Sequence, residues 1–300
     1  MTFSLSGLPS FDYYQPTTIR EALQLLRDNP ESKAYLGGTD LFPRLRKETI
    51  KANILIDLKW INDFPETMIS TSGDLIISPQ TSLSHLLAYL GESNGGEILS
   101  QAIQQLGTRS LRNRATLAGN LCNASPAADS AASLMVYNAN LTLQSLEGER
   151  TISINKFFSG AGKTVLRRDE LLTQITIPSQ HPQCKGTYLK LSRNKAADLA
   201  ICGVAVLVCP NELKESGYDF CIAVSGVNVV SLLVVEAGKF LAANEINRAN
   251  IHHAADIVAD CVTPLSDVRS SAEYRKDMVY QLSKKALLDT LNKFEVEVEQ

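Results

Sequence analysis

Residues 116–130 place the strongest constraint on how this chain can fold, because they are almost all small, hydroxyl-bearing or amide-bearing and stand between two apolar helical patterns. Such residues bury little apolar surface and bring hydrogen-bonding groups that need partners, which is unfavourable in a packed core. An ordinary surface loop would tolerate this run, but it would not need the Gly119-Asn120 step or an Asp129 framed by alanines. We therefore predict a loop that wraps a phosphate-bearing cofactor.

A second glycine turn stands earlier in the chain. Residues 34–36 predict a short strand, Gly37-Gly38-Thr39-Asp40 a turn, and residues 41–47 a helix. A turn between a strand and a helix N-terminus presents backbone N–H groups, which favours the binding of an anion. A plain tight turn is the alternative. Together, the two segments would grip the phosphates of one cofactor.

Length and composition describe an ordinary globular chain. Its 300 residues are enough for two domains, each with its own core. A net charge of −3 and a pI near 5.9 offer no basic surface for nucleic acid or for anionic membranes. The longest apolar runs, such as residues 200–209, are shorter than the roughly 20 residues that span a bilayer. The start of the chain lacks the pattern of a signal peptide, so we expect a cytoplasmic protein.

The six cysteines show no metal-binding pattern, because no two of them stand in a C-x-x-C spacing. Cys202, Cys209 and Cys221 lie in apolar surroundings, which predicts buried free thiols. The size of the chain and the expected compartment argue against a disulfide scaffold. The histidines are scattered, with no carboxylate at metal-ligand spacing, so we predict no metal site on this chain.

Two further segments bear on ligand binding. Arg109, Arg112 and Arg114 form a basic turn that is either a solvated face or a source of positive charge near a diphosphate or a partner subunit. Residues 160–164 read Gly-Ala-Gly-Lys-Thr and imitate the end of a P-loop, but Phe157 stands where the first glycine of that motif belongs. A nucleotide triphosphatase is therefore not predicted.

Hydrophobic periodicity and capping signals divide the chain into elements. Thr18 and Glu21 form a capping box that predicts a helix ending near Asn29-Pro30. Residues 179–185 form the best linker candidate, and an α+β pattern follows them. The expected helices are residues 82–90, 97–106, 127–136, 233–243, 248–260 and 271–291, and the expected strands are residues 53–58, 74–78, 140–144, 150–154, 170–177, 186–192, 200–209 and 220–227.

No arrangement of side chains for acid–base, nucleophilic or metal catalysis stands out in the sequence. The dinucleotide-binding fingerprint G-x-G-x-x-G is also missing from it. Two ligand-binding segments without a reactive side chain are typical of a protein whose chemistry belongs to a cofactor. The residues alone therefore indicate a phosphate-bearing cofactor held by an architecture other than the Rossmann fold.

Several segments match a known family in the same order along nearly the whole chain. Residues 34–41 resemble its first flavin loop, and Thr116-Leu117-Ala118-Gly119-Asn120 with Ala124-Ser125-Pro126 and Asp129 resembles its second. The later matches are Gly162-Lys163-Thr164, Glu170-Leu171-Leu172, Ile177-Pro178, Tyr188-x-Lys190-x-Ser192-Arg193, Asp198-x-Ala200 and Pro264-x-x-Asp267-x-Arg269-x-Ser271-x-x-Tyr274-Arg275. By these motifs the chain resembles the FAD-binding medium subunits of molybdenum hydroxylases, the enzymes related to xanthine dehydrogenase and aerobic carbon monoxide dehydrogenase.

The resemblance implies an α+β fold. Residues 1–180 would form a two-subdomain FAD-binding domain of the PCMH or vanillyl-alcohol-oxidase type, and residues 185–295 a C-terminal domain with a three-stranded antiparallel sheet and helices. Thr116, Gly119 and Asn120 would bind the FAD diphosphate together with the first loop. The implied cofactor-binding residues are Ala34, Tyr35, Leu36, Gly37, Gly38, Thr39, Asp40, Leu41, Leu106, Thr116, Ala118, Gly119, Asn120, Ser125, Asp129, Leu172 and Lys190.

The chain departs from the family pattern in a few places. Ala118-Gly119 replaces the common Gly-Gly, Ala161-Gly162 stands where Tyr-Arg is frequent, and Arg193-Asn194 where Arg-Arg is frequent. The last two changes bear on the electron acceptor and not on FAD binding. Only Cys122 lies near the place where some relatives insert four cysteines, so no iron–sulfur cluster is expected on this chain.

The predicted function is that of the FAD-binding electron-transfer subunit of a heteromeric molybdenum hydroxylase, an oxidoreductase. A large partner would carry the molybdenum cofactor, a small partner would carry [2Fe–2S] clusters, and FAD on this chain would pass electrons to NAD or to a quinone. No side chain of this chain would then need to act as a catalytic acid or base. Two alternatives stay open, namely a stand-alone FAD-dependent reductase or dehydrogenase with the same flavin fold, and a non-catalytic scaffold subunit.

Overall fold

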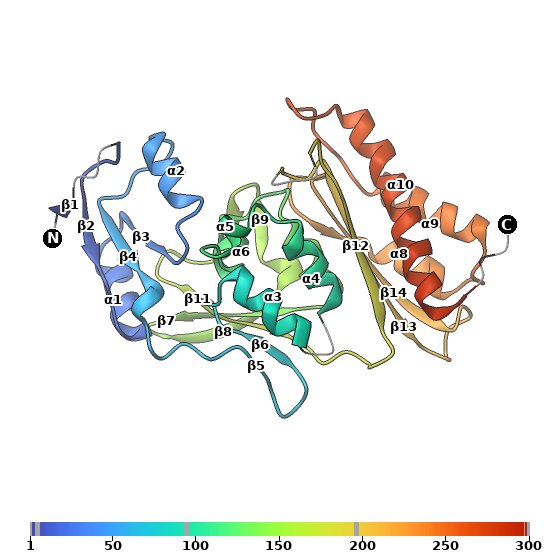
Figure 1. Ribbon diagram of the computed structural model, residues 1–300, viewed down its shortest axis with the longest axis horizontal. Coiled ribbons are helices and arrows are strands. Elements are labelled where there is room, and N and C mark those ends of the chain that lie inside the picture. Colours follow the sequence, from blue (N-terminus) through green and yellow to red (C-terminus); the bar gives the residue numbers. More distant parts are fainter. Residues whose placement is uncertain (1, 4–6, 93–95, 195–197, 297, 299–300) are drawn as a thin grey trace.

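The first part of the chain forms a four-stranded sheet in which β4 (Ile54–Asp57) lies between β2 (Phe11–Tyr14) and β3 (Ser32–Tyr35) and runs parallel to both. The structure is a computed structural model that describes residues 2–3, 7–92, 96–194, 198–296 and 298. The short strand β1 (Thr2–Phe3), the helices α1 (Ile19–Asp28) and α2 (Leu41–Arg46) and the 3₁₀ turn η1 (Leu58–Trp60) complete this unit (Figure 1). Thr18 caps α1 as predicted, because its hydroxyl accepts a hydrogen bond of 3.2 Å from the Glu21 N–H.

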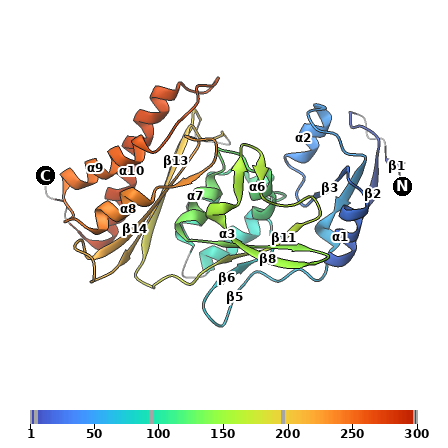
Figure 2. The same ribbon diagram turned by 180° about the vertical axis from the view of Figure 1, so that it is seen from behind.

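The middle of the chain forms a five-stranded antiparallel sheet with helices on one face (Figures 1 and 2). Its strands, in spatial order, are β5 (Met68–Ile69), β6 (Leu75–Ile77), β11 (Leu171–Ile177), β7 (Asn140–Ser145) and β8 (Gly148–Ser153). The helices are α3 (Leu83–Glu92), α4 (Glu97–Gln104), α5 (Arg109–Arg112), α6 (Leu117–Asn123) and α7 (Asp129–Val136). Ile77, Ile175 and Leu141 pair across three neighbouring strands and are fully buried. Along β7, the buried Leu141 and Leu143 alternate with less buried residues, as expected of a strand with one covered face.

Residues 154–164 form η2 (Ile154–Lys156) and a small hairpin of β9 (Phe158–Gly160) and β10 (Lys163–Thr164). The Gly162 N–H at its tip donates a hydrogen bond of 2.9 Å to the Ala124 carbonyl. A P-loop joins a strand to a helix, so this hairpin differs from that motif as the sequence indicates.

The last part of the chain is a sheet of β12 (Lys185–Leu191), β13 (Cys202–Pro210), β14 (Tyr218–Ser225) and β15 (Leu232–Leu233), all antiparallel. The resemblance implied three strands in this sheet. The sheet has four, because the two-residue β15 pairs with β14. The helices α8 (Val235–Ala242) and α10 (Ala272–Leu291) cover one face, and α9 (Arg248–Asp260) packs on both of them. The helices α4 and α7 cover the other face (Figures 1 and 2). Because β13 is covered on both faces, it reads as one continuous apolar run.

The prediction of a loop is wrong for residues 117–123, which form α6. A turn follows, and α7 begins at Asp129, within the expected helix of residues 127–136. Thr116 caps α6 by accepting a hydrogen bond of 3.1 Å from the Gly119 N–H. Leu117 and Leu121, one helical turn apart, are fully buried. Small residues between them concealed this narrow apolar stripe while allowing the helix to pack closely.

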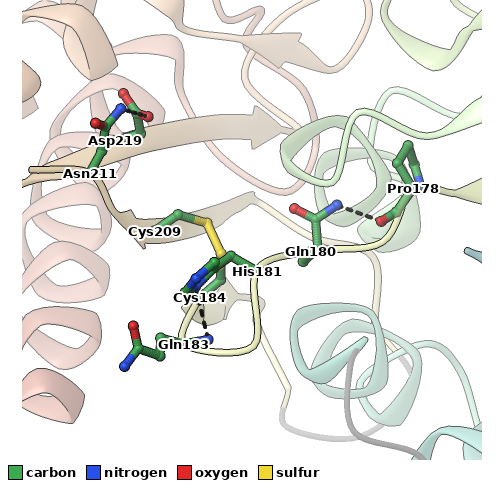
Figure 3. The surroundings of a disulfide bond; sticks show 8 residues. All are labelled: Pro178, Gln180, His181, Gln183, Cys184, Cys209, Asn211 and Asp219. Carbon is green, nitrogen blue, oxygen red and sulfur yellow. Dashed lines mark hydrogen bonds between the residues drawn. A yellow bond between two sulfur atoms is a disulfide. The ribbon is translucent and has the colours of Figure 1, made fainter. Parts of the chain in front are cut away.

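The prediction that Cys209 is a free thiol is also wrong, because a disulfide joins Cys184 and Cys209 (Figure 3). β12 and β13 pair with Lys185 opposite Val208, so the next pair outward brings the two cysteines together with 4.2 Å between their Cα atoms. Cys202 is buried and free as predicted, and Cys221 is free but only partly buried. The pairing depends on the strand register, which the cysteine spacing does not reveal.

The described residues, 2–3, 7–92, 96–194, 198–296 and 298, hold neither a membrane-spanning helix nor a cluster of metal-ligating side chains. Within those ranges, none of the helices combines the length and the apolar character that crossing a bilayer requires. Over the same ranges, no group of three or more His, Cys, Asp or Glu side chains is arranged to hold a metal ion.

Candidate functional site

A cleft of about 460 Å³ lies between the first unit, formed by β1–β4, α1 and α2, and the helices that cover the five-stranded middle sheet. Its walls come from the loop between β3 and α2, from the turn between α4 and α5, and from the stretch that contains α6 and the start of α7. Asp198 and Leu199, which precede β13, close one side of it. The two small-residue segments singled out in the sequence therefore meet in one site.

Gly37 is required by the close contact between two walls of this cleft, and Gly38 by the conformation of the turn and its contact with Phe42. A Cβ atom on Gly37 would overlap the carbonyl oxygen of Arg114 and lie 2.9 Å from the Ala115 Cα. Gly38 has a φ of +69°, and a Cβ there would lie 2.5 Å from the Phe42 ring. Only glycine permits both this backbone approach and this conformation.

A buried carboxylate holds the strand that enters the glycine loop. Asp57, at the end of β4, accepts hydrogen bonds from the hydroxyls of Tyr13 (2.6 Å) and Tyr35 (3.1 Å) and from the Lys59 ammonium (2.5 Å). The Lys59 ammonium also lies 4.4 Å from the centre of the Tyr35 ring. Burial alone would raise the pKa of Asp57, but the hydrogen bonds from Lys59 and Tyr13 outweigh it and lower the pKa. The side chain of Tyr35 is thus fixed at the edge of the cleft.

The start of α6 presents small groups to the cleft. A Cβ on Gly119 would approach one atom, the Thr116 Oγ, at 3.2 Å, which leaves its cleft side open among the described residues. The Asn120 Oδ1 accepts a hydrogen bond of 2.7 Å from the Ser130 hydroxyl, which orients the amide. Backbone, hydroxyl and amide groups therefore line this wall without bulky side chains.

The start of α7 carries a buried ion pair. The Asp129 carboxylate lies 2.8 Å from the Lys190 ammonium, and it accepts a hydrogen bond of 2.6 Å from the Tyr188 hydroxyl. Both members of the ion pair are about 95 % buried, with side-chain exposures of 5 % for Asp129 and 4 % for Lys190. Burial raises the pKa of the Asp129 carboxyl, and the charge and hydrogen bonds of Lys190 and Tyr188 act against that rise.

The arginines of the predicted basic turn separate into two kinds. Arg112 donates hydrogen bonds of 2.9–3.2 Å to the carbonyls of Gln104, Leu106 and Gly107, so it ties α5 to the end of α4. Arg109 and Arg114 are exposed. Arg44, on α2, is a basic side chain that lines the cleft and that the sequence interpretation missed.

The structure brings together most of the residues predicted to bind the cofactor. Residues 34–41 line the cleft with Leu106, Thr116, Gly119, Asn120, Ser125 and Asp129. Ala118, Leu172 and Lys190 do not line it: Ala118 and Leu172 are buried, and Lys190 forms an ion pair with Asp129, which does line it. The lining residues that were not predicted are Arg44, Gly107, Leu111, Ala115, Cys122, Asn123, Ala127, Ala128, Asp198 and Leu199.

Most of the missed residues could have been found, because they flank the predicted ones within one turn of a helix. Arg44 lies one turn after Leu41, and Asn123 follows Asn120 by the same spacing. Asp198 and Leu199 are different, since they come from the last unit and reach the cleft only through the packing of its sheet.

Comparison with known proteins agrees with this geometry over both parts of the chain. Residues 9–180 match the FAD binding domain in molybdopterin dehydrogenase, and residues 187–290 match the CO dehydrogenase flavoprotein C-terminal domain. The chain is 27% identical over 285 residues to the carbon monoxide dehydrogenase medium chain of Hydrogenophaga pseudoflava, covering 93% of this chain and 96% of that one. It is 26% identical over 281 residues to the xanthine dehydrogenase FAD-binding subunit of Escherichia coli O157:H7, covering 93% and 95%.

Solved structures show the same similarity in three dimensions. A chain of carbon monoxide dehydrogenase from Hydrogenophaga pseudoflava superposes with a TM-score of 0.90 at 25% identity, covering 95% of this chain and 98% of that one. A chain of the Cu,Mo-CO dehydrogenase superposes with a TM-score of 0.87 at 26% identity, covering 93% and 97%. The α+β fold expected from the sequence is confirmed. The chain belongs to the family defined by the FAD binding domain in molybdopterin dehydrogenase.

Proposed function

We propose that this chain is the FAD-carrying electron-transfer subunit of a heteromeric molybdenum hydroxylase and that the cleft described above holds the FAD. The observation that carries the proposal is the contact between the Gly37 backbone and the backbone of Arg114 and Ala115, which leaves no room for a Cβ. This contact joins two segments of small residues into one cleft, and such segments allow a cofactor to approach the main chain closely. The similarity to medium and FAD-binding subunits over more than nine-tenths of the chain supports the same function.

The donor set of the cleft fits a diphosphate. Thr116 and Asn120 contribute a hydroxyl and an amide, Gly119 leaves the main chain accessible, and the Arg44 guanidinium supplies positive charge. Charge-assisted hydrogen bonds to phosphate oxygens are stronger than neutral ones. We assign the diphosphate to these residues together with the loop of residues 37–40.

Apolar side chains on the same walls suit the ring systems of FAD. Leu36, Leu41, Leu106 and Leu111 line the cleft, whereas Leu172 is buried and does not. We assign the first four to direct contact with the cofactor. Lys190 then acts through its ion pair with Asp129.

FAD, when bound, supplies the redox chemistry by accepting electrons and passing them on. The chain itself binds and orients the cofactor. Electrons would arrive from a small [2Fe–2S] subunit, which receives them from a large molybdenum-cofactor subunit, and would leave to NAD or a quinone. We place this assembly in the cytoplasm. We also propose that residues 1–180 and residues 185–295 form the two domains of this chain.

One purification tests this function against the two alternatives. The chain is produced with its neighbouring subunits, isolated gently through a tag on this chain, and analysed by absorption spectrum, released flavin, molybdenum and iron. We expect FAD near one per chain together with molybdenum, iron and two other polypeptides. FAD and turnover without partners would instead support a stand-alone reductase, and partners without FAD would support a scaffold subunit.

A further inference from the structure

Two residues of β12 form hydrogen bonds to Asp129, a residue that lines the cleft. The Tyr188 hydroxyl donates a hydrogen bond of 2.6 Å to Asp129 Oδ1, and the Lys190 ammonium donates one of 2.8 Å to Asp129 Oδ2. Each carboxylate oxygen therefore has its own donor, and both donors come from the same strand. Because alternate residues of a strand point to one face, Tyr188 and Lys190 approach the carboxylate together.

The same strand is anchored to α4 and to the turn that follows it, and this turn lines the cleft. The Gln101 Oε1 accepts a hydrogen bond of 2.7 Å from the Tyr188 N–H, and the Gln105 carbonyl accepts one of 3.0 Å from the Lys190 ammonium. Gln105 immediately precedes Leu106, which lines the cleft. β12 thus bonds to two segments that border the cleft, the turn after α4 and the start of α7.

The Tyr188 hydroxyl packs against the backbone of Gly203, where a larger residue would not fit. A Cβ on Gly203, the residue of β13 beside it, would overlap this hydroxyl and lie 2.6 Å from the Ser225 Oγ. Burial, and then the charge of Asp129, raise the pKa of Tyr188 well above its ordinary value. The phenol therefore stays protonated and remains a donor to Asp129 at physiological pH.

We propose that Tyr188 is a positioning residue for FAD, because its buried hydroxyl holds the Asp129 carboxylate in the orientation that the cofactor meets. The docking of the last sheet against α4 and α7 is thereby linked to FAD affinity, although Tyr188 itself does not line the cleft. This inference rests on the proposed function, since it requires that the cleft bind FAD.

The test compares Tyr188→Phe with Tyr280→Phe in the full-length chain. Tyr280 is a matched control, because its hydroxyl also forms a side-chain hydrogen bond, 2.7 Å from His252 Nδ1, in the helical layer of the same unit. FAD is removed and added back while the quenching of its fluorescence is followed, and the melting of each FAD-free protein is recorded. We expect Tyr188→Phe to weaken FAD binding about tenfold, as loss of a hydrogen bond to a charged group does, and Tyr280→Phe to leave it within twofold.

A double-mutant cycle separates positioning from general destabilisation. If Tyr188 acts through Asp129, Tyr188→Phe changes FAD affinity less than twofold when Asp129 is already alanine. An unchanged tenfold effect in that background would overturn the inference. If Asp129→Ala does not fold, the comparison of Tyr188→Phe with Tyr280→Phe decides alone, and equal FAD affinities would overturn it. A wild-type chain that binds no FAD would instead refute the proposed function.

Discussion

The Arg275 guanidinium donates a hydrogen bond of 2.6 Å to the Gly226 carbonyl, and the N–H of the same glycine donates one of 2.8 Å to the Pro126 carbonyl. Arg275 also donates to Ile201 O at 2.7 Å and to Asp267 at 2.8 Å. Pro126 lies in the turn between α6 and α7, beside residues that line the cleft. The last sequence motif of the chain therefore supports the cleft from a distance.

Replacing Arg275 by methionine tests this support. The change removes three hydrogen bonds and leaves the carbonyls of Ile201 and Gly226 without this donor. We therefore expect the free energy of unfolding to fall by about 3 kcal/mol. Arg269→Met is the control, because the Arg269 guanidinium bonds at 3.0 Å to the exposed Asp267 and should contribute less than about 1 kcal/mol. Urea unfolding measures both variants, and equal losses would contradict the supporting role of Arg275.

Gly37→Ala tests the contact that closes the cleft. The new Cβ would overlap the main chain of Arg114, which cannot move aside as a side chain could, so we expect a loss of about 1–3 kcal/mol and reduced FAD occupancy. Gly91→Ala is the matched control, since a Cβ there meets no described atom within 4 Å. In a helix this control should be neutral or stabilising by up to about 1 kcal/mol. Full FAD occupancy in Gly37→Ala would remove the main support for the site.

Asn120→Asp tests the placement of the diphosphate. The carboxylate can still accept the hydrogen bond from Ser130, so the fold is preserved while a negative charge enters the cleft. We expect FAD affinity to fall by more than tenfold, and added salt to relieve part of the loss by screening. Asn155→Asp, on an exposed 3₁₀ turn, controls for added charge. An Asn120→Asp protein that binds FAD normally would place the phosphates elsewhere.

The Arg150–Glu170 pair predicts how stability depends on pH. Arg150 donates two hydrogen bonds of 2.8 Å to the buried Glu170 carboxylate, and these bonds lower the pKa of Glu170 below its ordinary 4.5. A carboxyl with a lowered pKa contributes stability above about pH 4.5, and the contribution is lost as the pH falls through the folded-state pKa. The free energy of unfolding is measured for wild type and for Glu170→Gln between about pH 7 and pH 3. The difference between the two proteins should shrink as the pH falls. Parallel curves would contradict the assignment.

The disulfide can be checked by counting thiols. In the unfolded, unreduced protein, alkylation should label four of the six cysteines, and reduction should expose the other two. Cys209→Ser should cost up to about 3 kcal/mol, since the cross-link closes a loop of 25 residues. Cys261→Ser, which removes a free thiol, should change stability little. Six labelled cysteines before reduction would show that the pair is reduced in the purified protein.

Local signals predicted the elements that depend on neighbouring residues. The helix at residues 248–260 and the cap at Thr18 agree with the structure, because caps and periodicity act within a few residues. The same signals failed at residues 117–123, where alanine and glycine left too weak an apolar stripe to indicate a helix. They also could not reveal β15, which has two residues and depends on its pairing with β14.

The sequence by itself indicated the family and the flavin cofactor through the motifs that it shares with that family. Its glycines and small residues also marked the two segments that form the cleft, because backbone conformation and close approach require them at these positions. Only the tertiary structure decided which distant residues meet there. Lys190 and Asp129 are 61 positions apart, and Cys184 and Cys209 are 25 apart. Their contacts follow from the register of β12 on β13 and from the packing of that sheet on α4 and α7. Register and packing result from the burial of whole faces, which no short stretch of sequence encodes.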